Sequence, residues 1–505
     1  MLLDRTNLRR KRLKISGDVV LNSHDYAYND GSQRTHQGFP GGSTTDYYYD
    51  NIGQLTNADS SVAAEDRGYY YDAAWNLNRR TNNGVTSTFS VNNKNELTNA
   101  LSTVLSYDDN GNLVSRSVGS FAEGWVYTYD DENQLIELNH RQNFRGVDST
   151  GDTLTDFIYD GLGRLRKRLE YHFEASQGDS PSQIQPDLPD PGSGWILDSE
   201  THYIYDGVRV IQERDGSNTP TVSYTRGNDL SASLEGAGGI GGLLARSHGY
   251  SGGNWSTHNF YHADGNGNIT YMVNSSQTLA ASYKYDPFGN LISSSGTLAG
   301  ANVYRFSSKE QHANSGMYYY GFRFYDPNLQ RWINSDPLEE HGGINLYAFI
   351  RNNPSNLRDP YGLECLNYGP GGTTRPIDQD PKRATIAGGI MAAGVIIVAG
   401  AAIAEALGPT VLGWLGLGGA AAESPQGQQA IQELAKEGEA VIAEEQRLWN
   451  ALGQAASDVL RAMQRADAAT NTAQRNALQE QAAAANKAYE EAFQKWQDFF
   501  NQCGH

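Results

Sequence analysis

The sequence predicts a mainly β protein, in which successive hairpins join side by side into one long, curling sheet, followed by a separate α-helical segment. Three observations support this prediction: a recurring Tyr-Asp unit, aromatic residues that alternate along the chain, and a change of composition after residue 363. The 55 glycines and 30 tyrosines in 505 residues also favour a turn-rich β protein over a helical enzyme.

The repeat consists of alternating aromatic residues, a Tyr-Asp pair, a short polar turn and a final Leu or Ile. The clear copies are Tyr49 to Leu55, Tyr71 to Leu77, Tyr107 to Leu113, Tyr129 to Leu135, Tyr159 to Leu165 and Tyr285 to Leu291. Alternation at period two places the aromatic side chains on one face of a strand. The aspartate and the glycine after it supply side-chain turn bonds and positive φ, which reverse the chain into a hairpin. Since a single hairpin is unstable, the copies must associate laterally.

A Tyr-Asp pair followed by Gly-Asn-Leu or Gly-Arg-Leu resembles the YD repeat of Rhs proteins, insecticidal toxin-complex C subunits and teneurins. The resemblance implies a β-sheet strip wound into a hollow shell, here formed by residues 40–300, with residues 1–39 as an N-terminal extension. This number of repeats is modest for a closed shell on a picture of linear stacking, so we expect a partial shell.

Residues 301–363 resemble the Rhs repeat-associated core domain along their whole length. The matching elements are Tyr304 to Glu310, Gly316 to Pro327, Arg331 to Pro337, Asn345 to Phe349, Asn352 to Pro354 and Asp359-Pro360-Tyr361-Gly362-Leu363. The resemblance implies a domain that plugs the end of the shell and acts as an aspartic autoprotease. Cleavage after the Asp-Pro-x-Gly-Leu motif would separate Leu363 from Glu364.

The resemblance assigns the catalytic roles to Asp336 and Asp359, with Arg323 beside them. Such a reaction needs two neighbouring carboxyl groups, one ionised to activate water and one protonated to polarise the peptide carbonyl. The arginine would hold a carboxylate or stabilise the oxyanion. Toxin-complex C subunits place an aspartate directly after this arginine, whereas Phe324 stands here, so Asp326 is a third candidate. All three aspartates could instead cap turns, and both interpretations stay open.

The composition changes after the core domain. Residues 364–384 form a Gly/Pro-containing linker, and residues 385–422 are rich in Ala and Gly, with no charge from Ile386 to Ala404. That length can span a bilayer, so residues 386–422 could form a helical membrane hairpin; a core helix packed inside protein is the open alternative. Residues 423–505, rich in Ala, Gln and Glu, predict a tail of two amphipathic helices.

Several classes of function are disfavoured. The net charge of −19 argues against nucleic acid as a partner, because phosphate binding needs clustered Lys and Arg, and we expect the basic run from Arg9 to Lys14 to be a solvated or fraying end. Two cysteines cannot form a disulfide framework. No metal site and no cofactor are predicted: Gly236 to Gly241 matches a dinucleotide pattern by letter but lacks its flanking elements, and is expected to be a flexible loop.

The sequence therefore predicts a carrier that cuts itself after residue 363 and encloses or delivers residues 364–505 as a toxin-like effector, with an immunity protein as a further partner. Autoproteolysis is the one enzyme activity indicated. The alternatives are a non-enzymatic surface or secreted protein that binds carbohydrate or neighbouring cells, and an inactive gene fragment. Because no signal peptide is visible, we expect secretion or display at the cell surface by a non-classical route, with membrane association through residues 386–422.

Overall fold

The computed structural model describes residues 10–119, 122–144, 148–175 and 194–363, the short segments 366–368 and 374–376, and residue 487. The chain divides into two compact units, Met1–Ala387 and Gly388–His505, and the fold below is that of the first. The predicted membrane hairpin and helical tail lie outside the described residues. No helix among the residues described has the length and apolar character needed to cross a bilayer.

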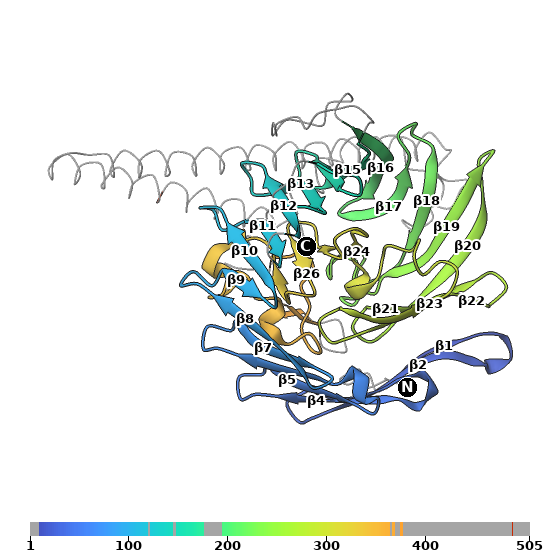
Figure 1. The fold of residues 1–505 in the computed structure, drawn as a ribbon. Coiled ribbons are helices and arrows are strands. Elements are labelled where there is room, and N and C mark those ends of the chain that lie inside the picture. Colours follow the sequence, from blue (N-terminus) through green and yellow to red (C-terminus); the bar gives the residue numbers. More distant parts are fainter. Residues whose placement is uncertain are drawn as a thin grey trace, which may run out of the picture. The chain divides into compact units, whose positions relative to one another are not determined.

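The first unit contains an antiparallel sheet of 23 strands in which each strand pairs with the next along the chain (Figure 1). The prediction of a mainly β fold is confirmed. The strands are β1 Arg10–Lys14, β2 Val20–Tyr28, β3 Arg34–Gly38, β4 Thr44–Tyr49, β5 Leu55–Ser60, β6 Arg67–Tyr71, β7 Leu77–Asn82, β8 Val85–Val91, β9 Leu97–Ala100, β10 Thr103–Tyr107, β11 Leu113–Val118, β12 Glu123–Tyr129, β13 Leu135–Arg141, β14 Thr153–Tyr159, β15 Leu165–Phe173, β16 Trp195–Asp206, β17 Arg209–Arg214, β18 Pro220–Arg226, β19 Leu243–Ser251, β20 Asn254–Ala263, β21 Ile269–Asn274, β22 Leu279–Tyr285 and β23 Leu291–Ser295.

The sheet begins earlier than the sequence motifs indicated, because residues 10–38, assigned above to an extension, form β1, β2 and β3. From Arg10 to Lys14, the basic run is therefore a strand rather than a fraying end. Its alternation turns Lys11 inward, where the ammonium donates to the backbone oxygen of Asp264 at 3.1 Å, while Arg10 and Arg12 stay outside. This bond, and one from Asn22 to His262 at 3.1 Å, join the first strands to the last ones.

Each repeat turn is built by its aspartate. In the turn after β10, one oxygen of Asp108 accepts the backbone N–H groups of Asn110 (3.0 Å) and Asn112 (2.8 Å), and the other accepts the Asn112 side chain (2.9 Å). Gly111 takes a φ of +82°, which glycine adopts without strain. Where a copy lacks glycine, a larger residue occupies this conformation, as Trp75 does with a φ of +66°.

The tyrosine of the Tyr-Asp pair links each repeat to the one before it. Its hydroxyl group donates to the backbone carbonyl of the first residue of a preceding strand, a contact that we call the tyrosine staple. The stapled pairs are Tyr49 with Arg34, Tyr71 with Leu55, Tyr129 with Leu113, Tyr159 with Leu135, Tyr205 with Leu165, and Tyr285 with Ile269. The four leucines and the isoleucine are at most 3% exposed, so the staples lie over the hydrophobic core.

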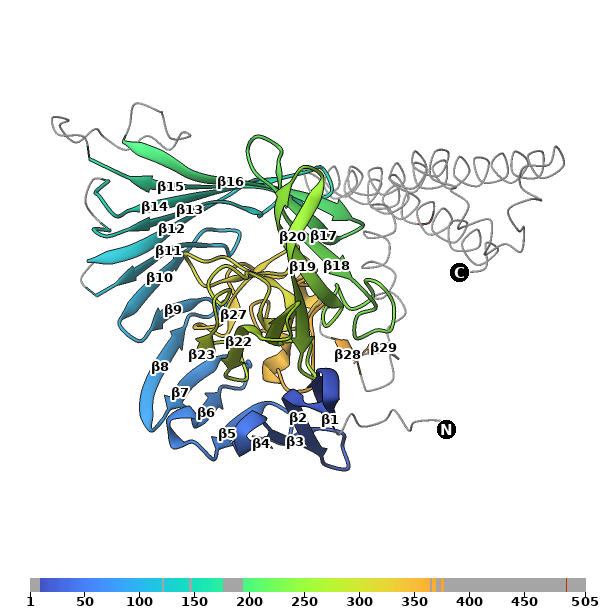
Figure 2. The same ribbon diagram turned by 90° about the vertical axis from the view of Figure 1, so that its right-hand side faces the viewer.

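The core domain lies within the curve of the sheet, where Figures 1 and 2 show it in yellow and orange. Its own sheet has four short strands, β24 Glu310–Gln311, β25 Tyr318–Tyr319, β26 Phe324–Asp326 and β27 Arg331–Trp332. Aromatic packing, more than regular secondary structure, holds the core domain together: the Tyr325 and Phe349 rings stack with centroids 3.7 Å apart. The core domain also packs on the large sheet, for example through Phe324 and Phe157, 5.1 Å apart. A short hairpin follows, β28 Leu366–Tyr368 and β29 Thr374–Pro376.

Candidate active site

Residues 359–363 form a buried turn, which we call the cleavage turn because the expected scissile bond follows it. One oxygen of Asp359 accepts three backbone N–H groups, from Tyr361 (3.1 Å), Gly362 (2.6 Å) and Leu363 (3.1 Å). Gly362 has a φ of +79°. Asp359 is 3% exposed and Leu363 is 4% exposed, so an Asp-Pro-x-Gly sequence places the last residue before the bond inside the protein. Glu364 lies outside the described residues.

Arg323, between β25 and β26, joins the two predicted aspartates. Its Nη2 atom donates to Asp336 at 2.7 Å and lies 4.0 Å from the Asp359 oxygen that is not used in the turn. Its Nε donates to the Gly362 carbonyl, and the guanidinium group lies 4.4 Å from the centre of the Trp332 ring. The structure therefore brings Arg323, Asp336 and Asp359 together beside the cleavage turn.

Asp336 follows β27 and starts a turn of its own, in which its second oxygen accepts the Leu338 N–H at 2.9 Å. Gly342 passes so close that a Cβ atom there would lie 2.4 Å from the Asp336 carboxylate. A larger residue at position 342 would displace this carboxylate. Sequence reasoning missed Gly342, and no local motif marks it.

Burial shapes the protonation of this cluster. It raises the pKa of Asp359 to about 6; Arg323 opposes the increase and Asp336 adds to it. Burial also raises the pKa of Asp336, again against Arg323. Two buried carboxyl groups on one guanidinium can thus hold one proton and one negative charge near neutral pH, which is the arrangement that aspartic catalysis needs.

Asp326 lies in a different environment. One of its oxygens forms an ion pair with Arg116 of β11 at 3.1 Å, and the other accepts the N–H groups of Asn328 (2.8 Å) and Leu329 (3.2 Å). This aspartate ties the core domain to the large sheet, and the structure does not bring it to Arg323 as it does the other two candidates.

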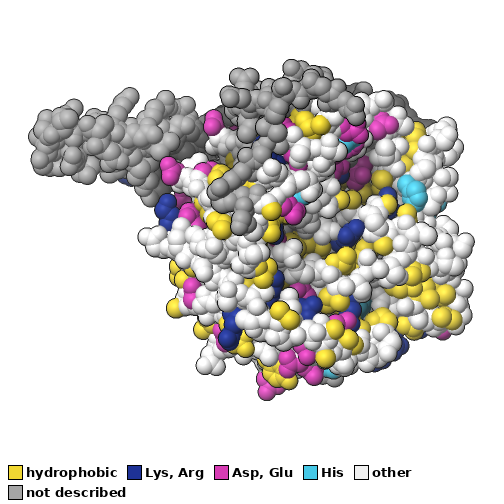
Figure 3. Space-filling model, in the orientation of Figure 1, with side chains coloured by type: hydrophobic (Ala, Val, Ile, Leu, Met, Phe, Trp, Pro, Cys, Tyr) yellow, Lys and Arg dark blue, Asp and Glu magenta, His cyan; other side chains and the backbone are white. Residues whose placement is uncertain are grey.

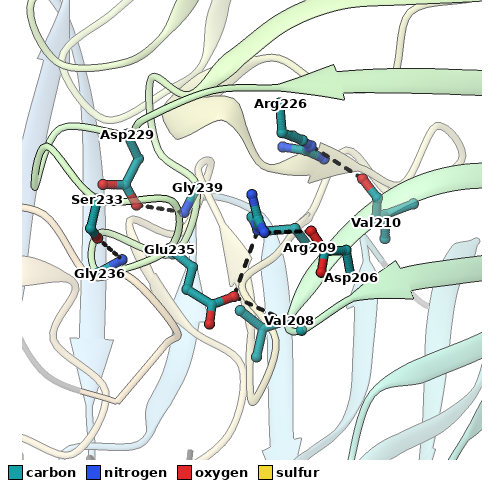
Figure 4. Close-up of polar contacts among 12 residues, drawn as sticks. Asp206, Val208, Arg209, Val210, Arg226, Asp229, Ser233, Glu235, Gly236 and Gly239 are labelled. Carbon is teal, nitrogen blue, oxygen red and sulfur yellow. Dashed lines mark hydrogen bonds and ion pairs between the residues drawn. The ribbon is translucent and has the colours of Figure 1, made fainter. Parts of the chain in front are cut away.

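Residues 227–242, between β18 and β19, form an ordered loop beside the cleavage turn. The expectation of a flexible glycine loop is wrong, because Ala237 and Ile240 are fully buried. One oxygen of Asp229 accepts the N–H groups of Ala237 (2.7 Å) and Gly239 (3.1 Å), and Figure 4 shows the carboxylate pointing at the Gly239 nitrogen. Glu235 in turn lies 3.6 Å from the Arg209 guanidinium of β17.

A separate cavity of about 260 Å³ lies between the first and last strands of the sheet. Its lining includes His24, Arg34, Phe39, Tyr47, Tyr283 and Lys284.

On the face shown in Figure 3, the lysine and arginine side chains of the described residues are scattered among neutral and acidic ones. Within the part of the chain that the structure describes, no group of three His, Cys, Asp or Glu residues could hold a metal ion.

No family model matches the chain, but curated relatives do. The double-stranded DNA deaminase toxin A of Burkholderia cenocepacia is 25% identical over 327 residues, which are 63% of this chain and 21% of that protein. The tRNA nuclease WapA of Bacillus subtilis is 28% identical over 329 residues, 62% of this chain and 12% of that protein. The toxin subunit YenC2 of Yersinia entomophaga is 48% identical over 64 residues, 13% of this chain and 6% of that protein.

Among solved structures, the Tc holotoxin pore of Photorhabdus luminescens, with a mutated TccC3 subunit, matches with a TM-score of 0.51 and 18% identity. The match covers 73% of this chain and 19% of that one, and it shows the shared fold. The fold and the repeat turns define a protein of the YD-repeat shell class. The relatives are toxin-complex and Rhs-type proteins, so the prediction of a Rhs/YD-repeat protein is confirmed. The chain spans 21% or less of the length of the three relatives named above.

Proposed function

We propose that this chain is the shell and core part of a Rhs-type toxin carrier, which cuts itself after Leu363 and retains residues 364–505 as its effector. The observation that carries the proposal is the convergence of Asp336 and Asp359 on the Arg323 guanidinium, directly beside the buried turn that ends at Leu363. Its relationship to toxin-complex and Rhs-type proteins supports the role of a toxin carrier.

The contacts support a separate role for each side chain. Asp336, whose ionised form is favoured by Arg323 at 2.7 Å, removes a proton from the attacking water. Asp359, more distant from Arg323 and with a pKa of about 6, provides the protonated carboxyl that polarises the Leu363 carbonyl. Water adds to that carbonyl, the C–N bond breaks, and the Glu364 nitrogen leaves with a proton. The products are a carboxylate on Leu363 and an amine on Glu364.

The test is the intact mass of the purified full-length protein. We expect two fragments, with Glu364 as the first residue of the smaller one, that elute together in gel filtration because the shell retains its segment. Asp336→Asn and Asp359→Asn should each leave one intact chain. The matched control is Asp131→Asn, the same change at an exposed turn residue, which should cleave normally. An uncut wild-type chain, or unchanged cleavage in Asp336→Asn, would contradict the mechanism.

The finer parts of the proposal concern delivery. Insertion of residues 386–422 into a target membrane and binding of an immunity protein to the effector involve segments outside the described residues. Release or display at the cell surface by a non-classical route is the third part. Vesicle flotation of the purified fragment that begins at Glu364 tests the first of these: the fragment should float with the vesicles, whereas a chain that lacks residues 386–422 should not.

The cavity favours one second candidate function, carbohydrate binding. Its lining combines the aromatic rings of Phe39 and Tyr283 with the polar ends of Arg34 and Lys284, a mixture that suits a sugar ring with its hydroxyl groups. A glycan array with the intact protein tests it. Binding that Tyr283→Ala abolishes would support a sugar site in the cavity, whereas binding that this change leaves intact would place any sugar elsewhere.

A further inference from the structure

Lys309, in the core domain, is a buried lysine whose hydrogen bonds go to two backbone carbonyls. It is 8% exposed, and its ammonium group donates to the Pro360 carbonyl at 2.5 Å and to the Gly238 carbonyl at 3.0 Å. Within the described residues, no carboxylate lies within ion-pair distance of this ammonium. Because burial lowers the pKa of Lys309 to about 7, its nitrogen donates to the two carbonyls both as a charged ammonium and as a neutral amine. Lys309 thereby fixes the cleavage turn against loop 227–242.

The backbone of the loop reaches the cleavage turn at the same point. A Cβ atom on Gly238 would lie 2.1 Å from the Pro360 carbonyl oxygen, so only glycine allows this approach. One residue further along the turn, the Tyr361 hydroxyl donates to the Glu235 carbonyl at 2.5 Å. Asp229 and Arg209 hold the loop in place, as Figure 4 shows. The position of the cleavage turn therefore depends, through the loop, on the position of the large sheet.

We propose that Lys309 and loop 227–242 form a brace that positions the cleavage turn. As a result, self-cleavage, on which this inference rests, occurs only after β18 and β19 have packed on the core domain. In this arrangement Lys309 is a positioning residue, because it contacts Pro360 rather than the reacting bond. The effector segment stays covalently attached until the wall around the core domain is in place. Premature release of the segment is thereby avoided.

Two neighbouring glycines provide a matched test. Gly238 and Gly239 both have positive φ, +59° and +76°, so alanine strains the backbone at either position. Only at Gly238 does the added Cβ meet Pro360, because at Gly239 its nearest neighbours lie 3.7 and 3.8 Å away. Gly238→Ala should slow cleavage by about 100-fold, the effect expected from a shift of about 1 Å in the reacting groups. Gly239→Ala should cleave at nearly the wild-type rate.

The measurement is a time course of full-length chain and fragments in cell-free translation, with the melting temperature of each purified variant as a check of folding. Equal cleavage by the two glycine variants, or slow cleavage by Gly239→Ala as well, would overturn the brace while leaving self-cleavage standing. A wild-type chain that stays intact would instead refute self-cleavage itself, and the brace with it.

Should Gly238→Ala fail to fold, Lys309→Met provides the second test. Its pH profile separates positioning from mere support, because the Lys309 charge faces Asp359, Asp229 and Arg226, while Asp359 also faces Arg323 and Asp336. With a pKa of about 7, Lys309 is charged near pH 6, where Asp359 titrates, so loss of this charge makes the proton on Asp359 harder to remove. We expect slower cleavage whose alkaline limit moves to higher pH. An unchanged rate and profile would overturn the proposal.

Discussion

The tyrosine staple predicts a specific loss of stability when its hydroxyl group is removed. The Tyr159 hydroxyl donates to the Leu135 carbonyl at 2.8 Å, and burial raises the pKa of this tyrosine well above its usual value. Tyr159→Phe keeps the ring but leaves the carbonyl without its donor, which costs about 1–2 kcal/mol. For a compact unit of this size we expect the melting temperature to fall by about 1–3 °C.

The control is Tyr48→Phe, because Tyr48 is 52% exposed and its change should stay within about 0.5 kcal/mol. Differential scanning fluorimetry of both variants in an Asp336→Asn background keeps a single uncut species in the sample. The triple change at Tyr71, Tyr159 and Tyr285 should lose about three times as much, since distant sites contribute independently. If Tyr159→Phe has the same melting temperature as Tyr48→Phe, aromatic packing alone joins the repeats and the staple contributes nothing.

Three further predictions concern the core domain and the turns. Because the proposed acid, Asp359, has a pKa of about 6, cleavage followed from pH 6 to 8 should slow, approaching about tenfold per pH unit at the alkaline end; a rate that rises with pH would make Asp359 the base. Asp326→Asn removes the partner of Arg116, so unfolding free energy should fall by about 3 kcal/mol while the folded protein still cleaves; loss of cleavage without loss of folding would return Asp326 to the catalytic set. Gly111→Ala places a Cβ 2.5 Å from the Tyr347 hydroxyl and should lower the melting temperature more than Gly84→Ala, which has positive φ but open space around it; equal effects would show that backbone strain alone matters.

The sequence motifs predicted the strands that follow a Tyr-Asp pair and missed the first ones. The reason lies in the turn between β2 and β3, where Asn29 replaces aspartate and its side-chain oxygen accepts the Gln33 N–H at 2.9 Å. An amide oxygen makes the same backbone contact as a carboxylate oxygen, so the turn forms without the aspartate that the motif predicts. Asn274 does the same before β22, where its oxygen accepts the Thr278 N–H at 3.0 Å. A search for either residue would have extended the sheet to its first strands.

The candidate site likewise contains residues that the sequence could predict and residues that it could not. Arg323, Asp336 and Asp359 could be selected because each lies in a motif with a recognisable order, and the structure brings them together. Lys309 and Gly238 could not, since the bond between them joins residues 71 positions apart and depends on how the large sheet curves around the core domain. The staple was missed for a different reason: alternating aromatic residues indicate packing, and only the choice of tyrosine over phenylalanine in every copy could have indicated a hydroxyl contact.

The two open interpretations of Asp359, as a turn cap and as a catalytic residue, apply to different oxygen atoms of its carboxyl group. One oxygen accepts the three N–H groups of the turn, and an asparagine oxygen would do this equally well, as Asn29 shows. The raised pKa of about 6 means that the unfolded chain loses its proton first, so Asp359 lowers stability as pH rises from about 4 to 6, by about 3 kcal/mol in total. Asparagine at position 359 would form the turn without this cost. The second oxygen lies 4.0 Å from Arg323 and takes no part in the turn. Only a carboxyl group can carry a proton on this atom, as the proposed proton transfer to Leu363 requires.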